Sequence, residues 1–484
     1  MGECCSEQSC AGVDTEHTCA DTECACVEVD CPPVGSDEYP EVVRIAQELI
    51  RIDTSNYGQS HKSHKNDAER SGGVPEIREI EAPAARYVMR LLEEVDYHPQ
   101  WIEPVPGRPN IVVRVPGADR SRPGLIVHGH LDVVPADPSE WERDPFGGEI
   151  VDGVLWGRGA VDMKDMVAMM VVLLRDMATN SWVPPRDLVV CFFADEEGGG
   201  WEGAQLIVRD YPEVFADCTE AISEVGGYAT YVNGKRVYLI QTAEKGQIWY
   251  RLLARGRAGH GSLENDDNAV TKIATALAAL GAEQWPYELT PTVRELLIGL
   301  ADITGIPFEE DSPESVEQLI AALGPARAFV GATTHATANP TQMNGGYAVN
   351  VVPGSAEGGV DIRFLPGEEE RVKLRVKELV GDVSTEPILN VPAIEAPVQA
   401  PLVEAMAQAI READPEAVVL PYMLSAGTDN KHLSQLGIAG YGFVPVNLPE
   451  GFDFPSMFHA ANERIPVQSL IDGAAVLRRF VQLS

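Results

Sequence analysis

Histidine and carboxylate side chains gather in five segments of the chain, each beside an apolar run or a glycine-rich turn. In the first, 125-LIVHGHLDVVP-135, an apolar stretch ends in His128, His130 and Asp132. Side chains alternate along a strand, so these three residues lie on one side of it. Imidazole and carboxylate suit zinc, and a carboxylate two residues from a ligating histidine can orient its ring. The segment predicts a metal site, with a structural histidine at a strand end as the alternative.

The second segment, 157-GRGAVDMKD-165, places Asp162 in a turn before a predicted helix. A carboxylate in such a turn is free to reach two ions at once. The alternative is a helix N-cap, which is a common role for aspartate just before a helix.

The third segment, 188-LVVCFFADEEGGG-200, is an apolar run that opens into Asp195, Glu196 and Glu197. Adjacent carboxylates at a strand end repel each other unless a cation neutralises them or one is protonated. Two adjacent glutamates also permit one to bind metal and the other to act as a general base. A solvated acidic loop is the alternative.

The last two segments contribute one residue each. Glu224 follows an apolar run in 221-AISEVGG-227, and His459 lies in a loop within 454-FPSMFHAANERIP-466, before the last helix. Neither residue is informative alone. Together, the five segments supply enough histidine and carboxylate ligands for a site with two metal ions.

The elements that must position these residues alternate between helix and strand. Amphipathic helices are predicted around residues 42–49 and 85–92, where apolar residues recur at i, i+3, i+4 and i+7. Short apolar runs between helical segments predict a mostly parallel sheet covered by helices on both faces, an α/β fold. The predicted strands are Ile111–Val115, Leu125–Val127, Leu188–Ala194 and Ala221–Val225.

A second, α+β domain is predicted as an insertion into the first. Residues 360–364 alternate apolar and charged side chains, which is typical of a half-buried antiparallel strand. Helical periodicity returns after Pro397, so the chain goes back to the first domain. The predicted boundaries are a leader at 1–38, a catalytic domain at 39–242 and 397–484, and the inserted domain at 243–396.

Composition and charge exclude several classes of protein. The formal net charge of −37 repels phosphate backbones and anionic lipid surfaces, so no nucleic-acid or membrane partner is expected. The longest apolar run, Met166–Leu174, is too short to cross a bilayer. The leader carries seven of the nine cysteines without any C-x2-C pair, and no secretion signal is visible. We expect a cytoplasmic protein with a solvated leader; metal capture or disulfide bonding by the leader is the alternative.

The order His-x-Asp, Gly-x-Gly-x-x-Asp, Glu-Glu-Gly, Glu and His resembles the dinuclear zinc peptidases and deacylases, over about residues 39–484. This family includes aminoacylase, acetylornithine deacetylase, succinyl-diaminopimelate desuccinylase and the glutamate carboxypeptidases. The resemblance implies two zinc ions, with cobalt or manganese as alternatives. It also implies ligand roles: His130 and Glu224 for one ion, Glu197 and His459 for the other, Asp162 as the bridge, Asp132 orienting His130, and Glu196 as the base.

The resemblance further implies substrate contacts, several of them in an inserted lid. His260 in 258-AGHGS-262 matches a lid histidine that binds the oxyanion, and Arg363 matches an arginine that clamps a substrate carboxylate. Asn350 is a neighbouring contact, and Gly427 and Thr428 match a loop that lines the same pocket. A plain surface position is the alternative for Arg363.

The implied activity is hydrolysis of an amide bond in N-acyl amino acids or small peptides. Glutamate at position 224 favours a deacylase or carboxypeptidase over an aminopeptidase, since the latter tend to carry aspartate there. A dipeptidase or aminopeptidase of the same fold and an inactive metal-binding member are the alternatives. The Gly-x-Ser-x-Gly motif that a serine hydrolase needs is absent from this sequence. The scarcity of Lys and Arg around the five segments counts against a metal-dependent phosphoesterase.

The oligomeric state is left open by the resemblance. Residues 287–346 lengthen the insertion beyond the compact lids of dimeric members and include a helix-like segment near 315–323. A homodimer through the lid is one expectation, with His260 acting in its own subunit or in a neighbour. The other is that the extra mass blocks this contact.

Overall fold

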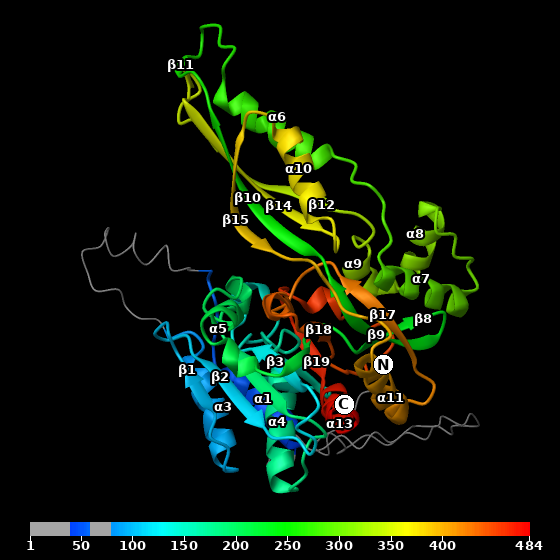
Figure 1. The fold of residues 1–484 in the computed structure, drawn as a ribbon. Helices are drawn as coiled ribbons and strands as arrows, with labels where there is room; N and C mark the ends of the chain where they lie inside the picture. The colour runs from blue at the N-terminus through cyan, green and yellow to red at the C-terminus, as the bar shows by residue number, and fades with distance from the viewer. Residues whose placement is uncertain (1–38, 59–78) are drawn as a thin grey trace, which may run out of the picture. The chain divides into compact units, whose positions relative to one another are not determined.

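The computed structural model describes residues 39–58 and 79–484 (Figure 1). The predicted leader, with its seven cysteines, lies outside the described residues. Residues Pro40–Ser484 form one compact unit. No helix in the described ranges is long and apolar enough to cross a lipid bilayer.

A mixed sheet carries the larger part of the chain. Its strands are β1 (Gln100–Ile102), β2 (Asn110–Val115), β3 (Gly124–His130), β6 (Leu188–Phe193), β7 (Cys218–Ser223), β8 (Tyr228–Val232), β9 (Lys235–Glu244), β16 (Ile394–Glu395), β17 (Val418–Leu424) and β18 (Ala439–Gly442). They follow the order β1-β2-β6-β3-β7-β18-β9-β16, with β8 and β17 also paired to β9.

The core of this sheet is parallel, as predicted. β3 pairs in parallel with β6 and β7, β7 with β18, and β9 with β17. β1, β2, β8 and β16, toward the margins of the sheet, run antiparallel to their neighbours, and β18 also meets β9 in antiparallel pairing. Strands β3 and β6 are buried along their whole length, because helices cover both faces of a parallel sheet. The predicted α/β class is therefore confirmed.

Helices cover the two faces of the sheet. α1 (Glu41–Arg51), α4 (Lys164–Thr179) and α13 (Val467–Leu483) pack together, with α3 (Ala82–Glu93) against α4 and α11 (Pro401–Ala413) against α13. On the other face, α5 (Ala204–Asp210) and α12 (Asn430–Leu433) share an apolar core with β3 and β6. The predicted amphipathic helices are confirmed by α1 and α3, whose apolar faces are buried.

A three-stranded antiparallel sheet joins distant parts of the chain. It consists of β4 (Glu149–Val151), β5 (Val154–Trp156) and β19 (Arg464–Pro466), in the order β19-β5-β4. Pairing of β19 with β5 brings the loop that contains His459 beside the turn that contains Asp162.

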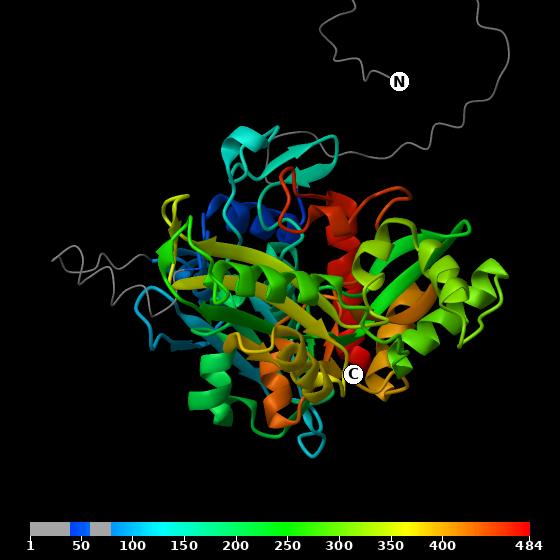
Figure 2. The same ribbon diagram turned by 90° about the horizontal axis from the view of Figure 1, so that it is seen from above.

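The inserted lid is an antiparallel sheet with two helices packed on it. Its strands follow the order β12-β14-β10-β15, and a short ribbon joins β11 and β13. Figures 1 and 2 show α6 running along the lid strands. The predicted half-buried strand at 360–364 is confirmed as part of β14. The lid elements are β10 (Gly246–Arg255), β11 (Gly259–His260), α6 (Ala269–Ala282), β12 (Thr337–Gly345), β13 (Val351–Val352), β14 (Ser355–Phe364), α10 (Glu369–Val380) and β15 (Ser384–Val391).

Three further helices form what we call the helical insert, residues 291–330. They are α7 (Pro291–Thr304), α8 (Pro313–Ala321) and α9 (Arg327–Val330). α7 packs against β17, β8 and β9, and α9 packs against β17, so the helical insert lies on the catalytic sheet. The domain boundaries at 242/243 and 396/397 stay a prediction.

Candidate metal centre

The predicted metal ligands lie at the carboxyl ends of neighbouring strands. His130 ends β3, Glu196 and Glu197 follow β6 in a short 3₁₀ turn, and Glu224 follows β7. Strands β6, β3 and β7 are adjacent and parallel, so their carboxyl ends share one edge of the sheet. That edge is the usual place for a binding crevice in sheets of this kind.

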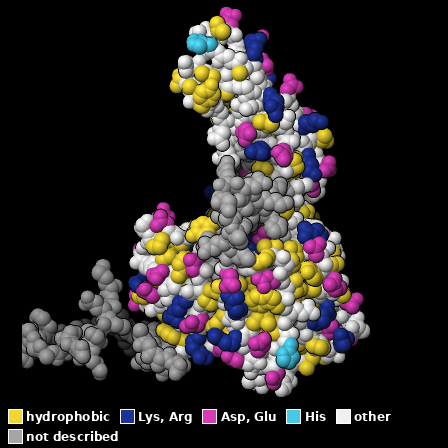
Figure 3. Space-filling model, turned by 90° about the vertical axis from the view of Figure 1, so that its left-hand side faces the viewer, with side chains coloured by type: hydrophobic (Ala, Val, Ile, Leu, Met, Phe, Trp, Pro, Cys, Tyr) yellow, Lys and Arg dark blue, Asp and Glu magenta, His cyan; other side chains and the backbone are white. Residues whose placement is uncertain are grey.

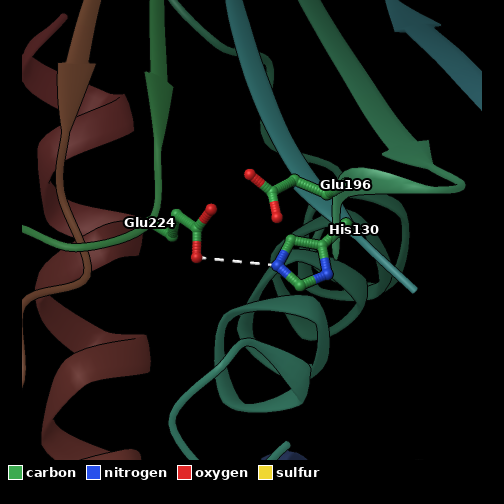
Figure 4. Close-up of side chains that lie close together, drawn as sticks. All are labelled: His130, Glu196 and Glu224. Carbon is green, nitrogen blue, oxygen red and sulfur yellow. Dashed lines mark ion pairs between the residues drawn. The ribbon is translucent and has the colours of Figure 1, made fainter. Parts of the chain in front are cut away.

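His130 lies at the centre of the cluster. Its Nε2 is 3.2 Å from Asp162 Oδ1 and 3.6 Å from Glu224 Oε2. The ligating atoms of His130, Glu196 and Glu224 lie within 4.8 Å of one another, as do those of His130, Asp162 and Glu197. Figure 4 shows Glu196 and Glu224 turned toward the imidazole of His130. The two groups of ligands therefore share His130.

His459 completes the second side of the cluster. Its Nε2 lies 3.3 Å from Asp162 Oδ2 and 3.2 Å from Glu197 Oε2. Asp162 thus presents one carboxylate oxygen to His130 and the other to His459. A carboxylate placed between two histidines in this way has the geometry to bridge two adjacent ions.

Asp132 connects three of these residues. Its backbone carbonyl lies 2.9 Å from His130 Nδ1, so this nitrogen is the donor, and in the neutral imidazole Nε2 directs its lone pair toward the carboxylates. The amides of Glu196 and Glu197 donate to the Asp132 carboxylate, at 3.2 and 3.1 Å. The orienting role of Asp132 stays a prediction; its carboxylate also fixes the backbone of both glutamates.

The backbone is unusual beside each ligand group. Asp195, before the glutamate pair, has φ 63°, Val225, after Glu224, has φ 50°, and His459 itself has φ 59°. The left-handed region costs roughly 1–3 kcal/mol for a residue other than glycine and occurs mainly where the surroundings enforce it. At Val225 the hydroxyl of Tyr422 donates to the carbonyl oxygen at 2.7 Å.

Glu463 is a functional residue that sequence reasoning missed. Its buried carboxylate accepts hydrogen bonds from the amides of Gly159, Val161 and Asp162, and from Arg158 Nη1 at 2.8 Å. It therefore shapes the turn that presents Asp162. The only sequence signal is its position four residues after His459, because its partners lie about 300 residues away.

Asn56 and Arg108 were also missed. Asn56 Nδ2 donates to the carboxylates of Asp132 and Asp195, both at 2.9 Å. The buried guanidinium of Arg108 pairs with Asp195 and with two more carboxylates, Glu81 and Glu202. Both residues contact the carboxylate of Asp195 and so stabilise the turn that precedes Glu196 and Glu197. A lone asparagine and a lone arginine carry no pattern that identifies such a role.

The predicted substrate residues lie in three other places. His260 is exposed on β11, with Nδ1 2.8 Å from Ser262 Oγ, and the carbonyl of Asn350 accepts from the Gly261 amide at 2.8 Å. Arg363 on β14 makes a bidentate ion pair with Asp361, at 2.8 and 2.9 Å. No hydrogen bond or ion pair between described residues joins these side chains to the metal ligands.

Thr428 and Gly427 belong to a loop next to the end of β9. The amide and hydroxyl of Thr428 donate to Glu244, at 2.9 and 2.7 Å. A side chain at position 427 would meet the buried ammonium of Lys431. Burial lowers the pKa of Lys431 to about 8, with Arg363 adding to the effect and the charges of Glu244 and Glu196 opposing it.

Comparison with known proteins decides the family. The model of Peptidase family M20/M25/M40 matches residues 126–483. The chain belongs to this family. N-fatty-acyl-amino acid synthase/hydrolase PM20D1 of Bos taurus is 26% identical over 419 residues, which cover 83% of this chain and 82% of that protein. Aminoacylase-1 of Mus musculus is 26% identical over 394 residues, covering 78% and 84%.

Solved structures of the M20 family share the fold. The M20 family metallo-carboxypeptidase Sso-CP2 from Sulfolobus solfataricus superposes with a TM-score of 0.68 and 17% identity, over 92% of this chain and 99% of that one. The resemblance to the dinuclear peptidases and deacylases is therefore confirmed. As a member of the M20/M25/M40 family, the chain is an enzyme that hydrolyses amide bonds.

The pKa values of the candidate metal centre of this M20 family enzyme are strongly shifted. Burial raises the pKa of Glu197 and of Glu224 to about 7, and it raises the pKa of Glu196 well above its usual range. Hydrogen bonds to Asp162 and Glu197 raise the pKa of His459 to about 10. The cluster thus binds excess protons when it holds no other cation.

The donor set fits divalent metal ions. Four carboxylates and two histidines meet at one edge of the sheet, and His130 Nε2 is buried without a hydrogen-bond partner. A buried polar atom without a partner is costly, and metal coordination would satisfy it. Mixed nitrogen and carboxylate donors suit zinc, cobalt and manganese.

Metal binding is expected to release protons near neutral pH. Metal ligands must be deprotonated, and in the free protein His459 holds its proton up to about pH 10 and Glu197 and Glu224 up to about pH 7. Affinity for zinc should therefore rise between pH 6 and 8. Calorimetry in two buffers of different ionisation enthalpy counts the released protons, and His459→Asn should release fewer. An affinity independent of pH would contradict this assignment.

Proposed function

We propose that this enzyme hydrolyses the amide bond of N-acyl amino acids or small peptides, as a deacylase or carboxypeptidase, with two metal ions. The observation that carries the proposal is the position of Asp162, whose two oxygens face His130 and His459 separately. Similarity to Aminoacylase-1 and to PM20D1, whose printed name is N-fatty-acyl-amino acid synthase/hydrolase, supports this substrate class. A dipeptidase or aminopeptidase, and an inactive metal-binding member, are the alternatives.

In this proposal the ligands divide between two ions. His130 and Glu224 would hold one ion, Glu197 and His459 the other, and Asp162 would bridge them. Three carboxylates against two doubly charged zinc ions leave one net positive charge. When bound, the ions would supply Lewis acidity toward the amide carbonyl and the attacking water. Cobalt or manganese in place of zinc is an alternative.

Glu196 is the general base in this proposal. Its carboxylate lies within 4.8 Å of the ligating atoms of His130 and Glu224, yet it is not needed as a ligand. The Asp132 carboxylate accepts a hydrogen bond from the Glu196 amide, which fixes the backbone from which the Glu196 side chain extends. Glu196 would take a proton from the attacking water and then deliver it to the leaving nitrogen.

Replacing the base should separate metal binding from turnover. Glu196→Gln is expected to keep both metal ions and to lose activity by several orders of magnitude, because the amide cannot accept the proton. Metal content by elemental analysis and kcat on N-acetyl amino acids measure the two effects. Glu404→Gln, an exposed position on α11, is the matched control. Turnover like that of the unmodified enzyme in Glu196→Gln would remove Glu196 from the mechanism.

The proposed substrate carboxylate would be bound by Arg363. Asn350, the other proposed contact, lies with His260 beyond the opposite end of β14 in the same subunit. Asp361 orients the guanidinium through Nε and Nη2. Burial lowers the pKa of Lys245 to about 7, and Arg363 adds to this effect there and at Lys431, so the three basic side chains lie close enough to influence one another, with the carboxylates of Asp361 and Glu244 beside them. Such a positive region would attract an anionic substrate despite the net charge of −37. His260 would bind the oxyanion.

Loss of Arg363 should affect substrates with a free carboxylate selectively. Arg363→Ala is expected to raise KM at least tenfold for N-acetyl amino acids and to change it little for their amides, since a guanidinium–carboxylate pair is lost only in the first case. Arg251→Ala on β10 is the control, because Arg251 also pairs with an acidic residue of β14. An equal effect on both substrate classes would argue against the clamp.

A homodimer through the lid is part of the proposal, together with a cytoplasmic location. Met343 on β12 and three further apolar side chains, Leu263, Tyr347 and Val349, are more than half exposed. Figure 3 shows hydrophobic side chains gathered at the tip of the lid. β12 ends the order of the lid sheet, and an edge strand with apolar side chains favours pairing with another chain.

Sedimentation should detect this association. The unmodified enzyme is expected to sediment as a dimer at micromolar concentration, and Met343→Lys as a monomer, because the added charges would face each other across a two-fold contact. Leu374→Lys, on the exposed side of α10, should leave the dimer intact. A monomeric unmodified enzyme would rule out the lid contact.

A further inference from the structure

The helical insert reaches the metal centre through one aromatic side chain. Phe329 lies on α9, and its backbone carbonyl accepts a hydrogen bond from the Ser425 amide, just after β17, at 3.2 Å. Its ring packs edge-on against Phe458 with centroids 5.2 Å apart. Phe458 immediately precedes the ligand His459.

Phe329 belongs to what we call the aromatic cluster, which has five members: Tyr228, Phe329, Tyr422, Phe454 and Phe458. Phe454 also packs edge-on against Phe458, at 5.2 Å. Tyr228 contacts Phe454 at 4.8 Å, Tyr422 at 6.0 Å and Phe329 at 6.3 Å. Edge-to-face aromatic pairs prefer a specific geometry, so the aromatic cluster fixes the relative positions of its rings in addition to burying their apolar surface.

The aromatic cluster contacts both ligand-bearing loops. At one end, Phe458 is bonded to His459, whose backbone is left-handed. At the other end, Tyr422 donates its hydroxyl hydrogen to the carbonyl of Val225, the left-handed residue after Glu224. Each loop therefore has an unfavourable backbone conformation beside its ligand and an aromatic contact next to it.

His459 has few other constraints. Its side chain is 59% exposed, and its ion-pair partners are the carboxylates of Asp162 and Glu197, which are themselves proposed ligands. Packing of Phe458 is a side-chain contact beside His459 that is independent of the metal centre; the loop is also held by the Ala460 amide, which donates to the Met457 carbonyl at 3.3 Å, and by Asn462, whose side chain accepts from the Glu142 amide at 2.8 Å. Phe329 supplies one of the two edge-on contacts to the Phe458 ring.

We propose that Phe329 is a positioning residue for the metal centre: through Phe458, it holds His459 in the geometry needed to bind a metal ion. The inference rests on the proposed function only in that His459 is taken as a ligand. It gives the helical insert a role at the metal centre of its own subunit. Removal of a hydrogen-bonded partner that orients a metal ligand typically changes metal affinity 10–100-fold, and we take this range as the scale expected for Phe329.

Metal titration of the apo-enzyme tests this role. Phe329→Ala is expected to weaken the binding of one of two zinc or cobalt ions about 10–100-fold and to change the visible absorption of the cobalt form, which reports ligand geometry. Phe329→Tyr keeps the ring and should restore both. Hydrogen exchange of residues 454–462 in the metal-free protein should be faster in Phe329→Ala, because the loop has lost its aromatic contact.

Phe215→Ala is the matched control. Phe215 is buried, packs edge-on against Phe193 at 6.5 Å, and lies outside the aromatic cluster. Phe215→Ala should lower thermal stability without changing metal affinity or the hydrogen exchange of residues 454–462. If Phe329→Ala does not fold, Phe329→Leu, which keeps apolar volume without the ring, is measured in the same way.

The outcomes separate this inference from the proposed function. Unchanged metal affinity and unchanged exchange in the Phe329 variant would overturn the positioning role, as would equal effects in the Phe215 control. If the unmodified enzyme binds no metal, the two-metal proposal fails, and the exchange of residues 454–462 alone then decides whether Phe329 restrains the His459 loop.

Discussion

Repulsion among buried carboxylates is the constraint on which the rest of this structure depends. Asp162, Glu196, Glu197 and Glu224 surround His130, and burial raises the pKa of the three glutamates. Such an arrangement is costly unless protons or metal cations share the space. A folded chain that assembles it must hold the acidic groups in place by other contacts.

Those contacts come from residues behind the cluster. Asp132 accepts the amides of both glutamates of the 3₁₀ turn, Asn56 links Asp132 to Asp195, and Glu463 accepts three amides of the Asp162 turn. Each hydrogen bond is made by a buried group, where leaving it unpaired would cost about 1–3 kcal/mol. The parallel sheet supplies the common edge, and the surrounding hydrogen bonds supply the direction of each side chain.

Much of this was predictable because the candidate ligands follow a simple local rule. His130, Glu196, Glu197 and Glu224 each end or follow an apolar run, and the pattern of residues 360–364 identified a lid strand. Asn56 and Glu463 follow no such rule, since their partners are 76 and about 300 residues away. The insertion at 287–346 was expected to add to the lid, whereas its helices α7 and α9 pack on the catalytic sheet.

By itself, the sequence determined which residues have side chains able to bind metal or accept a proton, and which strands are buried. Both follow from local properties, namely apolar periodicity and charged groups at strand ends. Only the tertiary structure decided that the two oxygens of Asp162 face different histidines, that left-handed residues lie beside the ligands, and that Phe329 contacts the His459 loop. These features depend on contacts between distant segments. Their geometry follows from the packing of the whole domain, and no local pattern encodes it.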